Sequence, residues 1–459
     1  MILFVLLTYI LTPTSNPADW RFPSLKYRNL ERVETILGTN TSFLSFKPAE
    51  STENVSEGTF LFSSYLNLSY RNKGGDRFIG YTELGFNGKL SPAKNWIIES
   101  ELVFFSKRSN EFNLQYWDPL NDYRRKLYIL KGEPAIGMAS FFDLRMPKAY
   151  TEYRSKKFKV RIGRFNLRMG PGYSSNFLFS GINKPLNFLY YVESGLGDKL
   201  HFLTFNASLS DTVEGKRVAY QRVELNPHKR ISLAISEAVV YTRRNLFKYI
   251  APFDFFYLIQ RHSADNDDNL LAEGNVTFYL PSGIKLYFIF FDDDWIITPE
   301  DNQASLYGYC LGFYAVRGNF DLRVEYSLVS PWSYAHFSQK NAWAINGTPL
   351  GHWAGNDFHH FFVEAGYQRS KNTLLTFDLE YLEHGMGNLE TPWESSGLPG
   401  NVSWPLPPVQ KTWMVYGMFE HEGKFNIYLK AGFYLEDKKV TPILSVNFKI
   451  GVLSKHIKG

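Results

Sequence analysis

Cysteines and long hydrophobic runs are both nearly absent from this chain. Its one cysteine, Cys310, can form neither an intrachain disulfide nor a cysteine-based metal cluster. No stretch of about 18 apolar residues occurs, which excludes a membrane-spanning helix. If the chain lies in a membrane, it must cross as a β-barrel, because a closed barrel pairs every backbone polar group.

A strong charge imbalance is absent too. Lys and Arg number 50 against 45 Asp and Glu, a formal net charge of +5, with no basic arm. Nucleic-acid binding therefore has little support. The chain also lacks a G-x-S-x-G elbow, an H-E-x-x-H motif and a P-loop. We predict a protein that is not an enzyme and that has no cofactor and no metal site. An enzyme site assembled from distant Asp, His and Ser remains an alternative.

Aromatic residues, in contrast, are abundant. Phe, Tyr and Trp make up 17% of the chain. Outer-membrane barrels place aromatics in girdles at the two membrane interfaces. A soluble β-sandwich with a sugar-binding face would also be rich in aromatics, so composition favours a barrel without deciding it.

The N-terminal region is expected to precede the barrel. Residues 1–15 combine an apolar core, from Met1 to Leu11, with small residues after it, and we predict a signal peptide. Residues 16–57 are polar and irregular, and are expected to form a periplasmic segment with a short helix over residues 30–37.

Residues 58–459 are predicted to form an all-β, transmembrane antiparallel barrel. Polar and apolar residues alternate in segments of about ten residues, the pattern of a wall with lipid on one face and a polar lumen on the other. In residues 425–435, for example, Phe425, Ile427 and Leu429 share one face with the remaining odd-numbered positions. The same split recurs around Leu375, Leu322 and Leu66.

Short turns and long connections mostly alternate, as periplasmic turns and extracellular loops do in such barrels. The long connections are expected outside the cell and lie near residues 107–137, 243–269, 330–358 and 384–410. Counting strands from the two ends leaves two consecutive strands running in the same direction, near 158–168 and 198–209. Either one more strand lies in 170–197, giving 18 in total, or that segment crosses the lumen as a plug.

A series of short motifs in residues 150–390 resembles the capsule assembly protein Wzi family. They are GRFNLRMGPG (163–172), LFSGINKPLNF (178–188), Ile235-Ser236-Glu237, Asp292-Asp293, GTPLG (347–351) and EYLEHG (380–385). Each is short, and the resemblance is carried by their shared order and spacing. It implies an 18-stranded outer-membrane barrel that acts as a lectin and holds capsular polysaccharide at the cell surface. With 18 strands, the strand directions counted from the two ends of the chain also agree.

Tryptophans gather in the long connections and are candidates for polysaccharide binding. Flat aromatic faces pack against sugar rings while polar neighbours satisfy the hydroxyls. The alternative is that the aromatics belong to the interface girdle or fold the loops onto themselves. The candidates are Trp117, Trp332, Tyr334, Trp343, Trp353, Trp393 and Trp404.

Charged residues on the polar faces of the strands are candidates for the lumen or a plug. Opposite charges there are expected to pair across strands and brace the wall, because unpaired buried charge is costly. A lining that selects a charged solute or an acidic glycan is the alternative. The candidates are Arg161, Arg164, Arg168, Glu237, Asp293, Arg323, Glu325, Asp378 and Glu380. The acidic runs 265–268 and 292–294 offer oxygen ligands for calcium, but neither matches an EF-hand loop.

Three hypotheses follow, in order of preference. The first is a noncatalytic surface lectin in the bacterial outer membrane, with surface polysaccharide, outer-membrane lipid and, during biogenesis, the barrel-assembly machinery as partners. The second is a porin-like channel for solutes, which an open lumen would favour. The third is an outer-membrane enzyme.

Overall fold

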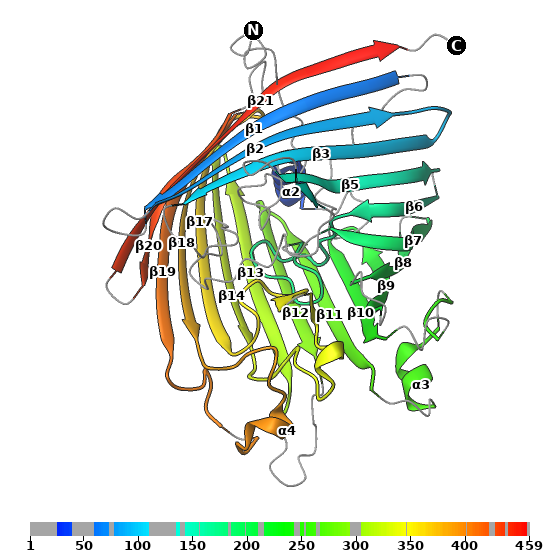
Figure 1. The fold of residues 1–459 in the computed structure, drawn as a ribbon, viewed down its shortest axis with the longest axis vertical. Helices are drawn as coiled ribbons and strands as arrows, with labels where there is room; N and C mark the ends of the chain where they lie inside the picture. Colours follow the sequence, from blue (N-terminus) through cyan, green and yellow to red (C-terminus); the bar gives the residue numbers. More distant parts are fainter. Residues whose placement is uncertain are drawn as a thin grey trace.

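The computed structural model describes residues 25–38, 59–72, 78–109, 135–137, 143–181 and 185–456, with short internal gaps in the last two ranges. Within these residues one large sheet curls round on itself, and Figure 1 shows its strands side by side as a wall. The predicted signal peptide, residues 1–15, lies outside the described residues.

The described part of the chain contributes nineteen strands to this sheet. One of them, β4 (Ala135–Gly137), pairs only with the first residues of β5. The other eighteen are β1 (Thr59–Asn72), β2 (Phe78–Leu90), β3 (Trp96–Ser109), β5 (Asp143–Arg154), β6 (Phe158–Phe165), β7 (Leu186–Leu196), β8 (Leu200–Ser208), β9 (Arg217–His228), β10 (Ile231–Tyr241), β11 (Asn269–Leu280), β12 (Ile284–Asp292), β13 (Tyr307–Arg317), β14 (Phe320–Val329), β17 (Phe358–Ser370), β18 (Thr373–His384), β19 (Gln410–His421), β20 (Ile427–Glu436) and β21 (Lys439–His456).

These eighteen strands form a closed ring. Each pairs antiparallel with the next one along the chain, and β1 pairs with β21 from Thr59–His456 to Arg71–Ile443. Closure leaves no free sheet edge, which a barrel in lipid requires. The predicted antiparallel barrel and its count of 18 strands are confirmed.

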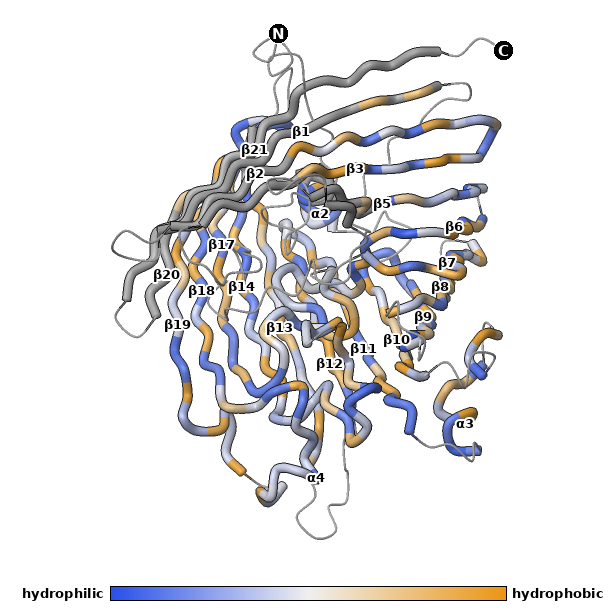
Figure 2. The backbone as a smooth tube through the Cα atoms, in the orientation of Figure 1, coloured by the Kyte–Doolittle hydropathy of each residue, from blue (hydrophilic) through white to orange (hydrophobic). Residues whose placement is uncertain are grey.

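The wall alternates as the sequence predicts. On β18, Leu375 and Phe377 are 43% and 56% exposed on the outside, whereas Asp378 and Glu380 are 0% exposed on the inside. The alternating colours along the strands in Figure 2 follow this pattern. Among the described residues, no helix is long and apolar enough to cross a membrane.

The two ends of the barrel differ in their connections. Tight connections such as 281–283 and 318–319 gather at one end, the turn end, and long connections such as 330–357 and 385–409 at the other, the loop end. The long connections predicted near 243–269, 330–358 and 384–410 lie at this end. Residues 110–134 of the first long loop lie outside the described residues.

Residues 170–197, where the strand count required either one more strand or a plug, contain both. The missing strand is β7, and residues 166–181, which precede it, fold inward, where Phe177 and Leu178 are 0% exposed. The strand that brings the total to 18 and the lumen-crossing segment, which the sequence offered as alternatives, are therefore both present. Residues 166–181 are called the plug segment below.

The helix predicted over residues 30–37 is present and begins earlier, as α2 (Leu25–Leu37). Its polar side chains contact inward-facing residues of β12, β14 and β17, so it lies inside the turn end of the barrel. The helix of the predicted periplasmic segment, 16–57, is therefore part of the filled lumen. The rest of that segment, apart from Gly38, lies outside the described residues.

Candidate functional site

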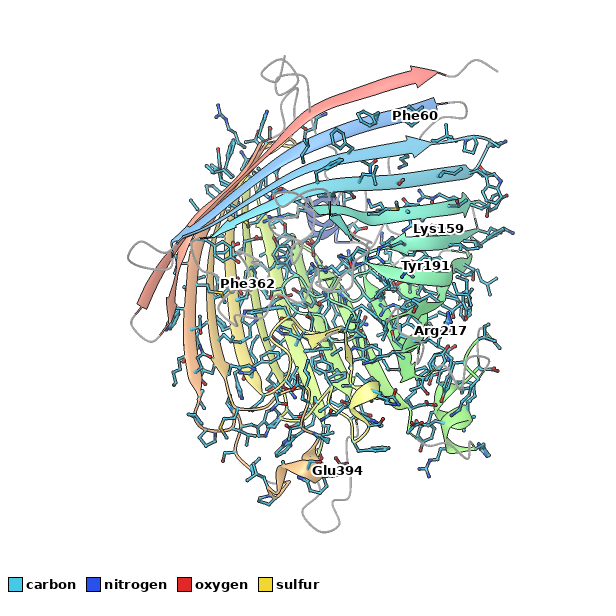
Figure 3. All side chains as sticks on the ribbon, in the orientation of Figure 1. Phe60, Lys159, Tyr191, Arg217, Phe362 and Glu394 are labelled. Atoms are coloured by element: carbon cyan, nitrogen blue, oxygen red, sulfur yellow. The ribbon has the colours of Figure 1, made fainter. Side chains whose placement is uncertain are left out.

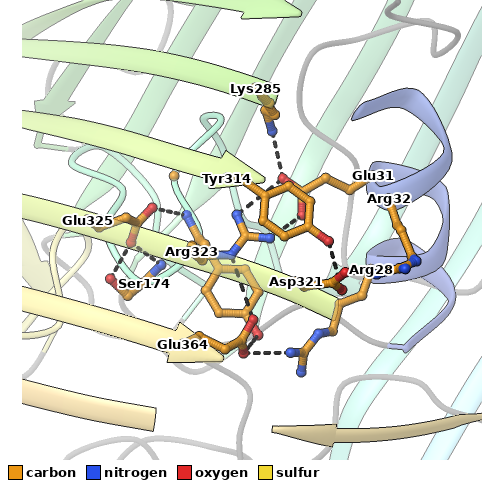
Figure 4. A network of polar contacts seen from close by, with 12 residues as sticks. Arg28, Glu31, Arg32, Ser174, Lys285, Tyr314, Asp321, Arg323, Glu325 and Glu364 are labelled. Atoms are coloured by element: carbon orange, nitrogen blue, oxygen red, sulfur yellow. Dashed lines mark hydrogen bonds and ion pairs between the residues drawn. The ribbon is translucent and has the colours of Figure 1, made fainter. Parts of the chain in front are cut away.

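Ion pairs hold α2 against the inner wall (Figure 4). The Glu31 carboxylate accepts hydrogen bonds from Arg323 Nη2 and Lys285 Nζ, each at 2.7 Å. One turn earlier, Arg28 Nη2 lies 2.5 Å from Glu364 Oε2. Arg28 and Glu31 are spaced to share one helix face, so the helix presents alternating charges to a complementary wall.

Burial and charge act in opposite directions on Glu31. Removal from water would raise the pKa of its carboxyl group, but Arg323 and Lys285 outweigh that effect and hold the pKa well below its ordinary value. Glu31 is therefore ionised at neutral pH, although only 3% of it is exposed.

Glu325 anchors the plug segment to the wall. Its carboxylate accepts hydrogen bonds from the backbone N–H groups of Tyr173 and Ser174, both at 2.6 Å, and from the hydroxyls of Ser174 and Tyr287. Tyr173 also donates its hydroxyl to Glu364 at 2.7 Å. A buried carboxylate with several donors needs no counter-ion in contact with it.

The plug segment and α2 meet around Arg323. The Arg323 guanidinium lies 4.0 Å from the ring centre of Tyr173, while its Nη2 binds Glu31 of α2. Burial raises the pKa of the Tyr173 hydroxyl, so it remains a hydrogen-bond donor. The two inserted segments are thus docked on one shared arginine.

Aromatic side chains fill the lumen beyond this polar centre. Phe179 of the plug segment packs edge-on against Phe205, Tyr220 and Trp343, with centroid distances of 5.4–5.6 Å. Figure 3 shows many side chains in the interior beside the described strands, among them Tyr191 and Phe362. The plug segment contacts β8 and β9 on one side and β14 and β17 on the other, so it crosses the lumen.

Most predicted lumen residues do lie inside. Eight of them are buried, with at most 7% of their surface exposed: Arg161, Arg164, Arg168, Asp293, Arg323, Glu325, Asp378 and Glu380. Arg161 pairs with Glu152 at 2.5 Å directly across strands β5 and β6, and Glu380 accepts a hydrogen bond from Tyr416. The Arg161–Glu152 pair is the expected pairing of opposite charges across strands, whereas Tyr416 gives Glu380 a neutral partner.

Four of the eight bind inserted or loop segments, among them Arg323, which binds Glu31 of α2 as described. Arg168 donates to carbonyls within the plug segment, at Gly172 and Tyr173. Asp293 accepts the backbone N–H of Tyr334 at 2.6 Å. Glu325 binds the plug segment as described.

Glu237 is the exception, because it lies on the outer face of the wall. On β10 the inward positions are Ser236 and Ala238, 1% and 0% exposed, so the alternation turns Glu237 outward. It accepts the backbone N–H of Phe256, in the loop after β10, at 2.8 Å. The prediction that Glu237 faces the lumen was wrong, because its two neighbours on the strand, Ser236 and Ala238, are the residues that face inward.

Four predicted sugar-binding aromatics are buried in the roof formed over the loop end by residues 330–357. Trp332, Tyr334, Trp343 and Trp353 are 4%, 0%, 0% and 3% exposed. Trp343 Nε1 donates to the carbonyl of Leu178 at 2.9 Å. In this conformation none of the four offers a free ring face to a polymer outside. Trp343 and Tyr334, whose hydroxyl donates to the Phe177 carbonyl, join the roof to the plug segment.

Glycines at this contact explain two of the short family motifs. A Cβ on Gly351 would clash with the Phe177 carbonyl and the Tyr334 hydroxyl, and one on Gly172 would clash with the Ser175 carbonyl. Glycine is the residue that lets backbone approach this closely.

The remaining aromatic candidates differ from one another. Trp393 begins the short helix α4 (Trp393–Ser396), is partly exposed, and packs on the cluster of Trp332 and Leu406. Trp404 contacts Tyr307 and His359 edge-on at 5.5 and 6.0 Å, and both partners are on the outward face of their strands. Trp404 therefore fits the interface girdle. Trp117 lies outside the described residues.

One serine–histidine pair has the spacing of a nucleophile and its base but the wrong proton arrangement. Ser175 Oγ lies 3.0 Å from His352 Nε2. The other ring nitrogen, Nδ1, accepts the backbone N–H of Ala354 at 3.0 Å, so in the neutral ring the proton sits on Nε2. His352 then donates to Ser175 and cannot take its proton. Both residues are 0% exposed.

The acidic runs considered for calcium are bound by protein groups where the structure describes them. Lys248 Nζ and the Tyr249 hydroxyl lie 2.7 and 2.8 Å from Asp268 Oδ2. Among the described residues, no group of three or more His, Cys, Asp or Glu is arranged to hold a metal ion.

The sequence analysis missed several residues of this interior: Arg28, Glu31, Tyr173, Ser174 and Glu364. The signal for α2 was present. Arg28, Glu31 and Arg32 recur at helical spacing within a polar segment, as on a helix docked against charges.

A closed antiparallel barrel with an apolar outer wall and a polar, filled lumen is an outer-membrane β-barrel. The model for the family described as capsule assembly protein Wzi matches residues 61–433, and the chain belongs to this family. Among curated proteins no relative matches the sequence.

Solved structures resemble this chain at low sequence identity, and one of them has a TM-score above 0.5. One is Escherichia coli Wzi, described as an outer membrane protein involved in group 1 capsule assembly and a carbohydrate-binding β-barrel. It superposes with a TM-score of 0.55 at 11% identity, over 96% of this chain and 94% of that one. Pseudomonas aeruginosa OccD3 (OpdP) gives a TM-score of 0.48 at 11% identity, over 98% and 100% of the two chains.

Proposed function

We propose that this barrel is a noncatalytic surface lectin, which binds capsular or related surface polysaccharide at the loop end and helps to hold it on the cell. The observation that carries the proposal is the filled lumen. With α2 and the plug segment docked inside, the surface left for a ligand is the outer side of the loops. Family membership and the carbohydrate binding named for E. coli Wzi point the same way.

The proposed binding surface is the roof face, residues 336–340 and 386–398. Its two loops are joined by Gln339, which donates to the Glu390 carbonyl at 3.0 Å. Phe337 is 60% exposed, and Trp393 is partly exposed. Exposed polar side chains at Asn388 and elsewhere on these loops supply partners for sugar hydroxyls beside the aromatic rings.

Binding of the purified protein to polysaccharide from its own host tests the proposal. Trp393→Ala and Phe337→Ala each remove one ring, worth about 0.5–1.5 kcal/mol if stacking resembles that between aromatic side chains. Such a loss weakens affinity by about two- to tenfold. Trp117→Ala belongs in the same series, because the sequence predicts Trp117 as a sugar-binding residue together with Trp393.

Trp413→Ala is the matched control, since Trp413 is 42% exposed on the outer face of β19 and belongs to neither loop of the roof face. Saturable binding that weakens in the roof-face variants and not in the control supports the lectin. Absence of binding by the intact protein contradicts it.

The two rival functions have less support. A channel needs a continuous water path, and the lumen is crossed by the plug segment and closed further by α2. An enzyme needs an accessible nucleophile with a free base, and Ser175 with His352 offers neither. Bilayer conductance and hydrolysis of the bound polysaccharide measure the two directly.

A further inference from the structure

The loop between β10 and β11 folds down over the outside of the wall. Near the loop end of β9 and β10 it covers outward-facing residues: Ala219, Val239 and Tyr241 are each 0% exposed. They pack with Tyr249 and Phe256 of this loop. In Figure 1 its helix, α3 (Phe256–Arg261), lies outside the ring of strands.

A polar latch fixes α3 to the wall. The outward-facing Glu237 carboxylate accepts the backbone N–H groups of Phe256 at 2.8 Å and Tyr257 at 3.4 Å. Gln221, opposite Glu237 in the β9–β10 register, donates to Glu237 and to the Asp254 carbonyl. An outward carboxylate on a barrel wall is costly next to lipid, and these donors satisfy it.

The lipid-facing wall begins directly below the latch. One outward position further towards the turn end, Ile235 and Val223 form the next register pair and are 74% and 43% exposed. Two residues of strand correspond to about 7 Å. The latch therefore marks the level at which the wall changes from protein-covered to lipid-covered.

The free side of α3 has the composition of a membrane interface. Phe255, Tyr257 and Leu258 are 70%, 49% and 52% exposed. Arg261 Nε donates to the Tyr257 hydroxyl at 2.9 Å, so a cation lies beside the aromatic ring. Aromatics and cations gather where acyl chains meet headgroups.

We propose that residues 254–262, the lipid foot, insert into the outer leaflet beside the barrel, with membrane lipid as the occupant of the exposed face. The wall below the foot on the same two strands is already lipid-facing, so the two apolar surfaces are continuous. The foot holds the loop end of the barrel at a fixed depth in the leaflet.

Fluorescent labels on the foot test this. Leu258→Cys and Phe255→Cys are each labelled with NBD in the intact barrel, reconstituted at one copy per phosphatidylcholine–phosphatidylglycerol nanodisc. The native Cys310 is 0% exposed, so labelling of the folded protein falls on the introduced thiol. Ile235→Cys is the lipid-facing control, and Phe337→Cys on the roof is the water-facing control.

Nitroxide lipids should quench the foot labels as they quench Ile235→Cys, and aqueous iodide should not. Quenching by iodide and not by lipid, as expected at Phe337→Cys, would overturn the proposal. Protection from both quenchers, or lipid-like behaviour that appears only when two barrels share a disc, would identify protein as the occupant and overturn it too. Adding Glu237→Ala to Leu258→Cys should reduce lipid quenching, and unchanged quenching would remove Glu237 from the latch.

Discussion

Replacing Glu31 with alanine should release α2 from the barrel. The Glu31 carboxylate binds Arg323 and Lys285 at 2.7 Å, and all three side chains are at most 4% exposed. Glu31→Ala leaves these two buried cations without the carboxylate that they share. Arg323 retains Glu364, but at the longer distance of 3.8 Å from Nε, and Lys285 loses its only ion pair described in this network.

The size of the effect follows from that geometry. Removal of one partner from a buried ion pair costs about 3–5 kcal/mol, because the other charge stays buried without compensation. Such a cost shifts the docking equilibrium of α2 by roughly two to nearly four orders of magnitude. The Arg28–Glu364 pair on the same helix face does not offset it, since that pair is unchanged.

Amide hydrogen exchange over residues 29–37 measures the docking. Val33→Ala is the matched control on the same helix, because Val33 is 48% exposed and alanine is a good helix former. Exchange should speed up across α2 in Glu31→Ala and stay slow in Val33→Ala. Slow exchange in Glu31→Ala, in a barrel that still folds, would refute the docking argument.

Three further predictions use the same interior. Docking of α2 should be constant from pH 8 to about pH 5. The pKa of Glu31 is lowered in the docked state, so its contribution to stability is present above the ordinary carboxyl pKa of about 4.3 and is lost only as the pH falls towards the lowered pKa. The spectrum of a spin label attached at Ile36→Cys measures the docking. Glu325→Ala should cost about 3 kcal/mol or more by leaving the backbone donors of the plug segment unsatisfied, seen as faster exchange of residues 172–175. Trp343→Ala should lower the unfolding temperature far more than Trp413→Ala, because Trp343 is fully buried and its loss costs about 3–5 kcal/mol, whereas Trp413 is 42% exposed.

The wall of the barrel was predictable because its signal is local. Strand alternation repeats every two residues, and turn residues mark the ends, so β18 could be drawn from residues 373–384 alone. β7 was harder, because Leu186–Leu196 reads Leu-Asn-Phe-Leu-Tyr-Tyr and breaks alternation at the bulge near Phe188. Strand parity revealed its presence without its boundaries.

The candidate site was less predictable, because exposure in a loop is a tertiary property. Trp343 and Trp393 both lie in long loops, yet one is buried against the carbonyl of Leu178 and the other is partly exposed. Nothing within several residues of either tryptophan distinguishes them. Sequence reasoning could place both at the loop end but could not choose between them.

Eight of the nine charges predicted for the lumen lie inside it, but the prediction gave them only one of their two roles, and barrel size explains the difference. Wall side chains fill the interior of a barrel of about eight strands, but one of 16–18 strands leaves a channel unless more chain enters it. Here that chain is α2 and the plug segment, whose exposed backbone and charges need partners on the wall. Arg323 and Glu325 are those partners, whereas Arg161 pairs with the next strand as predicted. Opposite Glu325 on the two neighbouring strands lie Gly312 and Phe362, which carry no charge, and a buried charge so placed in a wide barrel is therefore evidence for an inserted segment.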